Sequence, residues 1–186
     1  MKSGLILVDI QNDYFPGGRM ELEGMSDAAR NAGELLSVFR ENNWPTFHIQ
    51  HLSVHQGATF FLPDTQGAEI HDGIQPLPDE KIIQKNFPNS FRETALLEEL
   101  EKNQVGRVII CGAMSHMCID ATTRAAFDLG FECVVISDAC ATRNLEFEGQ
   151  TIGAGQVHGC FMAALGSAYA GILTAEGFTS NILKAR

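Results

Sequence analysis

The chain has 186 residues, 45% of them hydrophobic and 19% charged, and a formal net charge of -10. This length and balance suit a soluble protein with one substantial core, so we expect a single domain over residues 1–186. The negative charge argues against nucleic acid and membranes as partners, because nucleic acids and anionic membranes both select basic surfaces.

The cysteines and the amino-terminal segment indicate a reducing compartment. The chain has five cysteines, an odd number, and no CxxC pair, which argues against a disulfide framework and a structural zinc site. The apolar run in MKSGLILVDIQ is too short for a signal peptide and is broken by Asp9. We therefore expect a cytoplasmic protein.

Short apolar runs alternate with helical patterns along the whole chain. The first strand is expected at 4–9, followed after Ser26, a candidate N-cap, by a helix that carries Ala29, Ala32, Leu36 and Phe39 on one face. Further strands are expected at 45–52, 81–85, 107–112, 132–138 and 171–174, and further helices at 94–102, 121–129 and 157–169.

This alternation predicts an α/β protein of three layers, α/β/α, with a mostly parallel sheet of about six strands and a Rossmann-like arrangement. Sheets of this kind bind ligands at the carboxyl ends of their strands. The irregular region 53–80 is too long for a simple connection, and we expect it to form an active-site loop or an oligomer contact.

Three chemically active side chains follow strand ends in this arrangement. Asp9 ends the first strand, Lys85 ends the third, and the fourth runs into GAMSHMC, which ends at Cys118. Taken singly, Asp9 could cap a loop, Lys85 could be a surface lysine and Cys118 could fill the core. Cys118, however, falls in the first turn of an expected helix, where N–H groups and the helix dipole stabilise a thiolate.

The segments LILVDIQNDYF, KNFPNSF and CGAMSHMCID resemble, in order and spacing, the isochorismatase-like cysteine hydrolases, which include nicotinamidases and N-carbamoylsarcosine amidases. The resemblance implies a catalytic triad of Asp9, Lys85 and Cys118. It also implies a cis peptide at Ala113–Met114 and an oxyanion hole formed by the N–H groups of Met114 and Cys118.

The implied chemistry is hydrolysis of a small amide or carbamoyl substrate through an acyl-thioester. Lys85 and the helix start would favour the thiolate, and Asp9 would carry the proton between the thiol and the leaving amine. Isochorismatases proper, which cleave an ether, resemble this chain but lack the cysteine. Ether hydrolysis, a non-catalytic or regulatory member of the fold, and a phosphatase with Asp9 as nucleophile remain alternatives, although such phosphatases place an Asp where this chain has Gln11.

No metal or other cofactor is expected. Nicotinamidases of the family carry a metal held by an Asp and histidines after the second strand, but HIQHLSVHQGATFF lacks the Asp-x-His order. His48 and His51 are three residues apart and would point to opposite faces of a strand. Whether His51, His55 or His71 binds a metal is left open.

Substrate and assembly are the least determined features. Candidate substrate contacts are, by motif or loop position, Asn12, Phe15, Phe60, Phe87 and Ser115. The glycines of GAGQVHG indicate close helix packing, within one chain or between subunits, and the resemblance implies a homodimer or homotetramer.

Overall fold

The computed structural model describes residues 1–184, and its centre is a six-stranded parallel sheet. The strands are β1 (Lys2–Val8), β2 (Thr46–His51), β3 (Lys81–Lys85), β4 (Val105–Ala113), β5 (Glu132–Ala141) and β8 (Gly171–Leu173). Their order across the sheet is β3-β2-β1-β4-β5-β8, and every pairing is parallel. The predicted α/β class and strand number are confirmed.

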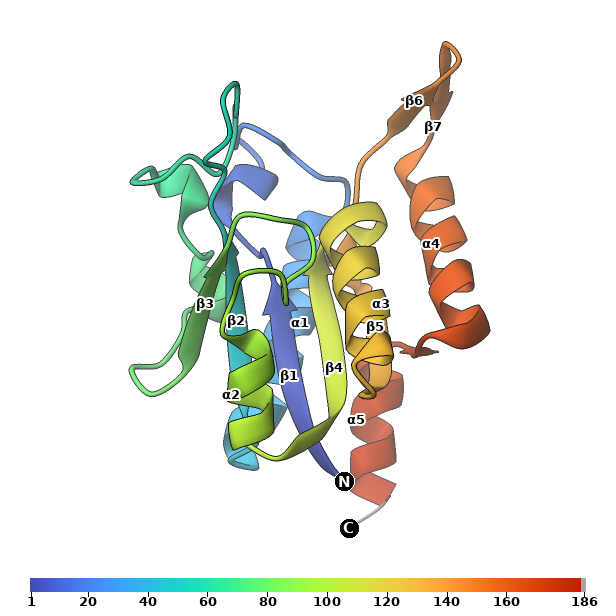
Figure 1. Ribbon diagram of the computed structural model, residues 1–186. Coiled ribbons are helices and arrows are strands. Elements are labelled where there is room, and N and C mark those ends of the chain that lie inside the picture. Colours follow the sequence, from blue (N-terminus) through green and yellow to red (C-terminus); the bar gives the residue numbers. More distant parts are fainter. Residues whose placement is uncertain (185–186) are drawn as a thin grey trace.

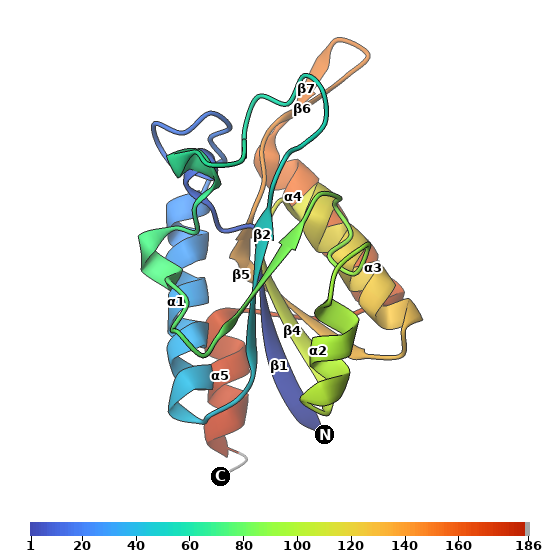
Figure 2. The same ribbon diagram turned by 60° about the vertical axis from the view of Figure 1, so that its left-hand side comes forward.

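Helices cover both faces of this sheet (Figures 1 and 2). Helices α1 (Met25–Glu41) and α5 (Ala175–Lys184) pack on one face, and α2 (Leu96–Lys102), α3 (Asp120–Asp128) and α4 (Ala154–Ala168) lie on the other. Alternate residues of β1 serve the two cores, because successive side chains of a strand point to opposite faces. Leu5 and Leu7 join the core under α1, whereas Ile6 and Val8 join the opposite core.

The chain order places a switch point between β1 and β4. From β1 the chain builds outward through β2 to β3, and it then returns to the other side of β1 to form β4. A crevice at the carboxyl ends of the strands is expected where the winding direction reverses. The residues that follow β1 and β4 therefore lie at the position where this class of sheet binds ligands.

Several expected boundaries were wrong. Helix α1 begins at Met25 after a left-handed Gly24, so Ser26 is not its N-cap, and α4 begins at Ala154 instead of residue 157. Helix α5 and three short 3-10 helices, Asn12–Tyr14, Gln66–Ala68 and Asp72–Ile74, were not expected. Neither was the hairpin of β6 (Leu145–Phe147) and β7 (Gln150–Ile152), which projects beyond α4 in Figure 1. The turn of this hairpin is Glu148-Gly149, and both residues have positive φ. Among the described residues, no helix has the length and apolar character needed to cross a bilayer.

Candidate active site

Four adjacent strands each bring one side chain to the carboxyl edge of the sheet. Lys85 is the last residue of β3, His51 is the last residue of β2, and Asp9 directly follows β1. Cys118 lies in the short π-helical turn Ser115–Ile119, which joins β4 to α3. The expected meeting of Asp9, Lys85 and Cys118 is confirmed, and His51 is a fourth member of the row that was considered only as a possible metal ligand.

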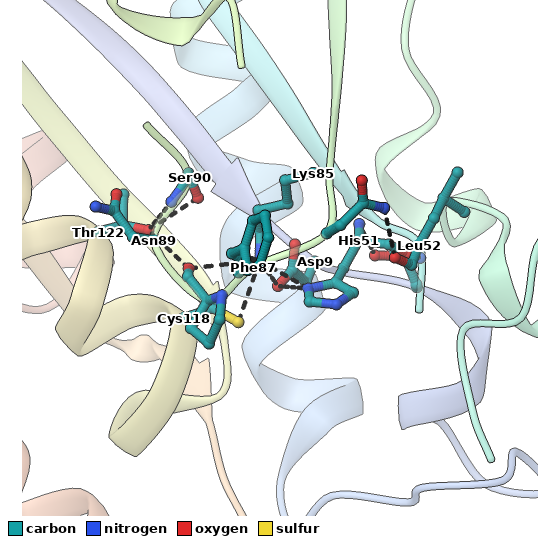
Figure 3. A network of polar contacts seen from close by, with 12 residues as sticks. Asp9, His51, Leu52, Lys85, Phe87, Asn89, Ser90, Cys118 and Thr122 are labelled. Carbon is teal, nitrogen blue, oxygen red and sulfur yellow. Dashed lines mark hydrogen bonds and ion pairs between the residues drawn. The ribbon is translucent and has the colours of Figure 1, made fainter. Parts of the chain in front are cut away.

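The ammonium of Lys85 is the centre of this cluster (Figure 3). Its Nζ lies 2.7 Å from Asp9 Oδ2, 3.0 Å from His51 Nδ1 and 3.2 Å from Cys118 Sγ. It also donates to the carbonyl of Phe87 at 3.1 Å. The Lys85 side chain is fully buried, so these acceptors replace the water that would otherwise solvate its charge.

The surroundings of Cys118 favour the neutral form of its thiol. Burial raises the pKa of Cys118 well above the usual range, the Asp9 carboxylate raises this pKa further, and Lys85 only partly reverses the effect. Burial lowers the pKa of Lys85, but Asp9 and Cys118 more than offset this, so the pKa is raised and the ammonium persists. The thiol has a proton acceptor close by, because ligand atoms of Asp9 and Cys118 lie within 4.8 Å of each other.

Asp9 is held in an unusual conformation and is poorly satisfied. Its φ of 52° lies in the left-handed region, which is uncommon for a residue other than glycine. Oδ2 forms the ion pair with Lys85, yet neither carboxylate oxygen accepts a hydrogen bond in good geometry from the described residues. A buried carboxylate with unused lone pairs is suited to accept a proton from a neighbour.

The turn after β4 brings Cys118 back toward the sheet. Gly112 has a φ of 120°, and a Cβ there would collide with the carbonyl oxygen of Val8, so only glycine fits. The peptide Ala113–Met114 is cis, as expected. Ser115 joins the turn to α4 and β5, because its Oγ lies 2.8 Å from His158 Nδ1 and 3.3 Å from the Ala141 carbonyl oxygen.

The long loop is fastened to the site by two buried polar residues that the sequence reasoning did not identify. The Asp13 carboxylate accepts the N–H of Phe61 at 2.6 Å. The Gln11 side chain accepts the N–H of His51 at 2.7 Å and donates to the carbonyls of His51 at 2.9 Å and Ala68 at 2.8 Å. These contacts join residues that are 40 to 57 positions apart in the sequence, a separation at which no local pattern could predict them.

The five expected substrate contacts are placed in different surroundings. Phe87 is next to the triad through its carbonyl, and its ring stacks under the Arg92 guanidinium, 3.6 Å from the centroid. Ser115 is fully buried in the turn. The other three lie as follows: Asn12 donates to Gln66, Phe60 packs near Tyr14, and Phe15 stacks on His71 beside α1.

Phe15 thus belongs to another part of the molecule. With His71 and residues of α1 it lines a cavity of about 530 Å³, and no triad residue lines that cavity. A direct contact of Phe15 with a substrate at Cys118 has no support in this arrangement, because its ring packs against His71 and α1. The other four positions remain predictions.

The histidines do not fit a metal site around the triad. Ligand atoms of Asp9, His51 and Cys118 lie within 4.8 Å of one another, but the Lys85 ammonium lies at hydrogen-bonding distance from all three. A metal ion would have to displace this cation. His55 is exposed, and His71 packs against Phe15. Among the described residues, neither joins Asp9, His51 and Cys118 in a group whose ligand atoms all lie within 4.8 Å of one another.

A thiol, a carboxylate and an ammonium thus meet at the carboxyl edge of a parallel α/β sheet, close to its switch point. Residues 3–164 match the model of the isochorismatase domain family. The chain is 48% identical to the isochorismatase family protein YddQ of Bacillus subtilis, over 96% of this chain and 99% of YddQ. It is 32% identical to nicotinamidase 3 of Arabidopsis thaliana, over 81% of this chain and 78% of that protein.

A solved structure agrees with these sequence matches. The crystal structure of an isochorismatase hydrolase from Oleispira antarctica superposes with a TM-score of 0.93 and 44% identity, covering 96% of each chain. The chain therefore belongs to the isochorismatase family of hydrolases, as the three motifs indicated.

Proposed function

We propose that this protein is a cysteine hydrolase that cleaves the C–N bond of a small amide or carbamoyl compound through an acyl-thioester. The observation that carries the proposal is the position of Lys85 Nζ, 2.7 Å from Asp9 Oδ2 and 3.2 Å from Cys118 Sγ in a buried site. A nucleophile, a proton acceptor and a fixed positive charge are the groups that acyl transfer to sulfur requires.

Acylation begins with the neutral thiol. Asp9 takes the proton of Cys118 as Sγ attacks the substrate carbonyl carbon and forms the C–S bond. The N–H groups of Met114 and Cys118 receive the developing oxyanion, where one such donor is worth about 3 kcal/mol in studied enzymes. Asp9 then passes its proton to the leaving nitrogen, the C–N bond breaks, and the amine departs.

Deacylation uses the same groups in reverse order. Asp9 accepts a proton from a water molecule, which attacks the thioester carbon. The C–S bond breaks, the acid is released, and the sulfur recovers its proton from Asp9. In the free site Asp9 and Cys118 raise the pKa of Lys85, so the residue is a cation that can stabilise whichever partner becomes anionic.

The presence of a cysteine favours C–N over ether cleavage, because an ether has no acyl carbon on which a thioester could form. The named amidase among the relatives, nicotinamidase 3, supports the same direction. The loop 53–80, held over the site by Gln11 and Asp13, is the part of the molecule that we expect to select the substrate.

The proposal is tested by a screen of small amides and carbamoyl compounds, nicotinamide included, with ammonia release as the readout. We expect at least one compound to be hydrolysed by the wild type and not by Cys118→Ala. Isochorismate is assayed in parallel. Cleavage of that ether by both proteins would favour the ether alternative, and no turnover of any compound together with an unreactive Cys118 would favour a non-catalytic role.

A further inference from the structure

We propose that His51 is a positioning residue of this site: its Nδ1 accepts a hydrogen bond from the Lys85 ammonium and so holds that cation between Asp9 and Cys118. The inference rests on the proposed function, and it assigns to the end of β2 a task that neither the family match nor the triad requires. His51 acts through Lys85, which lies 3.0 Å from its Nδ1.

The sheet order explains why Lys85 needs such a partner. Strand β3 carries Lys85, strand β1 leads to Asp9, and β2 lies between them. The lysine side chain must therefore pass across the end of β2 to reach the carboxylate. His51 is the register partner of Lys85, so the two side chains leave neighbouring strands on the same face. Figure 3 shows the imidazole beside both the ammonium and Asp9.

His51 Nδ1 is one of several acceptors that share the hydrogen-bond donors of Lys85. An ammonium has three donors, and the acceptors within 3.2 Å are Asp9, His51, Cys118 and the Phe87 carbonyl. Without His51, the Phe87 carbonyl and the Pro88 carbonyl at 3.5 Å would gain a larger share of these donors. Both carbonyls would then compete with Asp9 and Cys118 for the donors of the ammonium, so its position between the carboxylate and the sulfur would be less well defined.

The protonation state of His51 suits this role. Lysine has only donors, so Nδ1 must be the unprotonated nitrogen and Nε2 must carry the hydrogen. The titratable groups that face the ring are Asp9, Lys85, Cys118 and His55. Burial lowers the pKa of His51 to about 4, and the attraction of Asp9 only partly opposes this shift. The imidazole is therefore a neutral acceptor at neutral pH.

Hydrogen bonds also fix the backbone of His51. Gln11, itself fully buried, binds both the N–H and the carbonyl of His51. The next residue, Leu52, donates its N–H to the Lys85 carbonyl at 2.9 Å. Three hydrogen bonds thus fix the backbone at His51 and Leu52. A fixed backbone lets the imidazole keep a constant distance to the Lys85 ammonium, as a positioning role requires.

The test measures the reactivity of the Cys118 thiol, which needs no substrate. In a Cys160→Ser background, the alkylation rate of Cys118 by iodoacetamide is followed by peptide mass spectrometry from pH 6 to 10. The variants are His51→Leu, which lacks an acceptor, and His51→Asn, whose amide oxygen can reach the position of Nδ1. His51→Gln, whose amide extends toward the position of Nε2, and Lys85→Met complete the set.

We expect His51→Leu to slow alkylation about tenfold, since a hydrogen bond to a charged group is lost, and His51→Asn to stay within about threefold of the parent. Lys85→Met should slow it at least as much as His51→Leu. Thermal melting verifies folding; if His51→Leu does not fold, His51→Gln takes its place as the variant without an acceptor at Nδ1.

The outcomes separate this inference from the proposed function. If Lys85→Met slows alkylation but His51→Leu does not, the role of His51 is refuted while the triad stands. If His51→Asn is as slow as His51→Leu, the acceptor at Nδ1 is not what matters, and the inference is also refuted. If Lys85→Met leaves the rate unchanged, the proposed task of the lysine fails, and with it the reason to position it.

Discussion

Two histidines of β2, three residues apart, belong to two ionic clusters, one partly exposed around Glu80 and one buried around Lys85. His48 Nε2 lies 2.9 Å from Glu80, which also binds Arg40 through both carboxylate oxygens at 2.7 Å and accepts the N–H of Leu77. His51 lies on the other face, in the cluster of Asp9, Lys85 and Cys118. One strand thus supports a structural cluster and a candidate catalytic one.

The difference lies in how the carboxylates are satisfied. Burial alone would raise the pKa of Glu80, but hydrogen bonds from Arg40, Leu77 and His48 reverse this and lower it to about 2. Asp9 has one ion pair and no well-formed hydrogen bond among the described residues. A fully satisfied carboxylate stabilises the fold, whereas an under-satisfied one beside a thiol keeps the capacity to move a proton.

The largest effect is expected when the nucleophile is removed. Cys118→Ala should lower kcat on any confirmed substrate by about 10⁴-fold or more, because no thioester can form. The matched control is Cys160→Ser, which changes an exposed thiol of α4 and should leave kcat unaltered. Equal activity of Cys118→Ala and the wild type would remove the cysteine from the mechanism.

Asp9→Asn should have the next largest effect. The amide cannot carry a proton from sulfur to the leaving group, so kcat should fall by about 10²–10⁴-fold, while circular dichroism should report an unchanged fold. Turnover near the wild-type rate would show that another group transfers the proton.

Glu80→Gln should lower stability and leave activity nearly unchanged, the reverse of what is expected for Asp9→Asn. Loss of the charged hydrogen bonds with Arg40 should cost about 2 kcal/mol of unfolding free energy, measured by urea denaturation, and kcat should change little. A large loss of activity without loss of stability would contradict the division between the two clusters.

The pH dependence of stability sharpens the same prediction. The pKa of Glu80 in the folded state is depressed to about 2 from its ordinary 4.5. Its contribution is therefore present above pH 4.5 and is lost as the pH falls toward 2. Over this range the unfolding free energy of Glu80→Gln should fall less steeply than that of the wild type.

The smallest effect is expected from metal removal. Lys85 takes the place that an ion bound by Asp9, His51 and Cys118 would need, so dialysis against a chelator should leave turnover unchanged. Restoration of lost activity by zinc, iron or manganese would contradict this and return His51 to the role of a ligand.

The triad could be predicted because each member ends a strand or follows one closely, and parallel strands bring their carboxyl ends together. His51 also lies at the carboxyl end of its strand, β2. Because other histidines, His48 and His55, lie close to it in the sequence, it was considered only as a possible metal ligand. The clamps of Gln11 and Asp13 on the long loop could not be predicted, because they depend on where that loop folds back. The balance of influences on the pKa of Cys118 could not be predicted, because burial, which raises this pKa more than Lys85 lowers it, is a tertiary property.

The central claim, that Cys118 carries the acyl group, is tested most directly by rapid acid quench and peptide mass spectrometry. The wild type is mixed with the best amide from the screen and stopped within the first turnover. We predict an added mass on the Cys118 peptide equal to the acyl group without the amine. This acyl adduct should form before the free acid appears and should decay as the acid accumulates. An acyl adduct on any other residue, or release of acid with no adduct at any time point, would contradict the account.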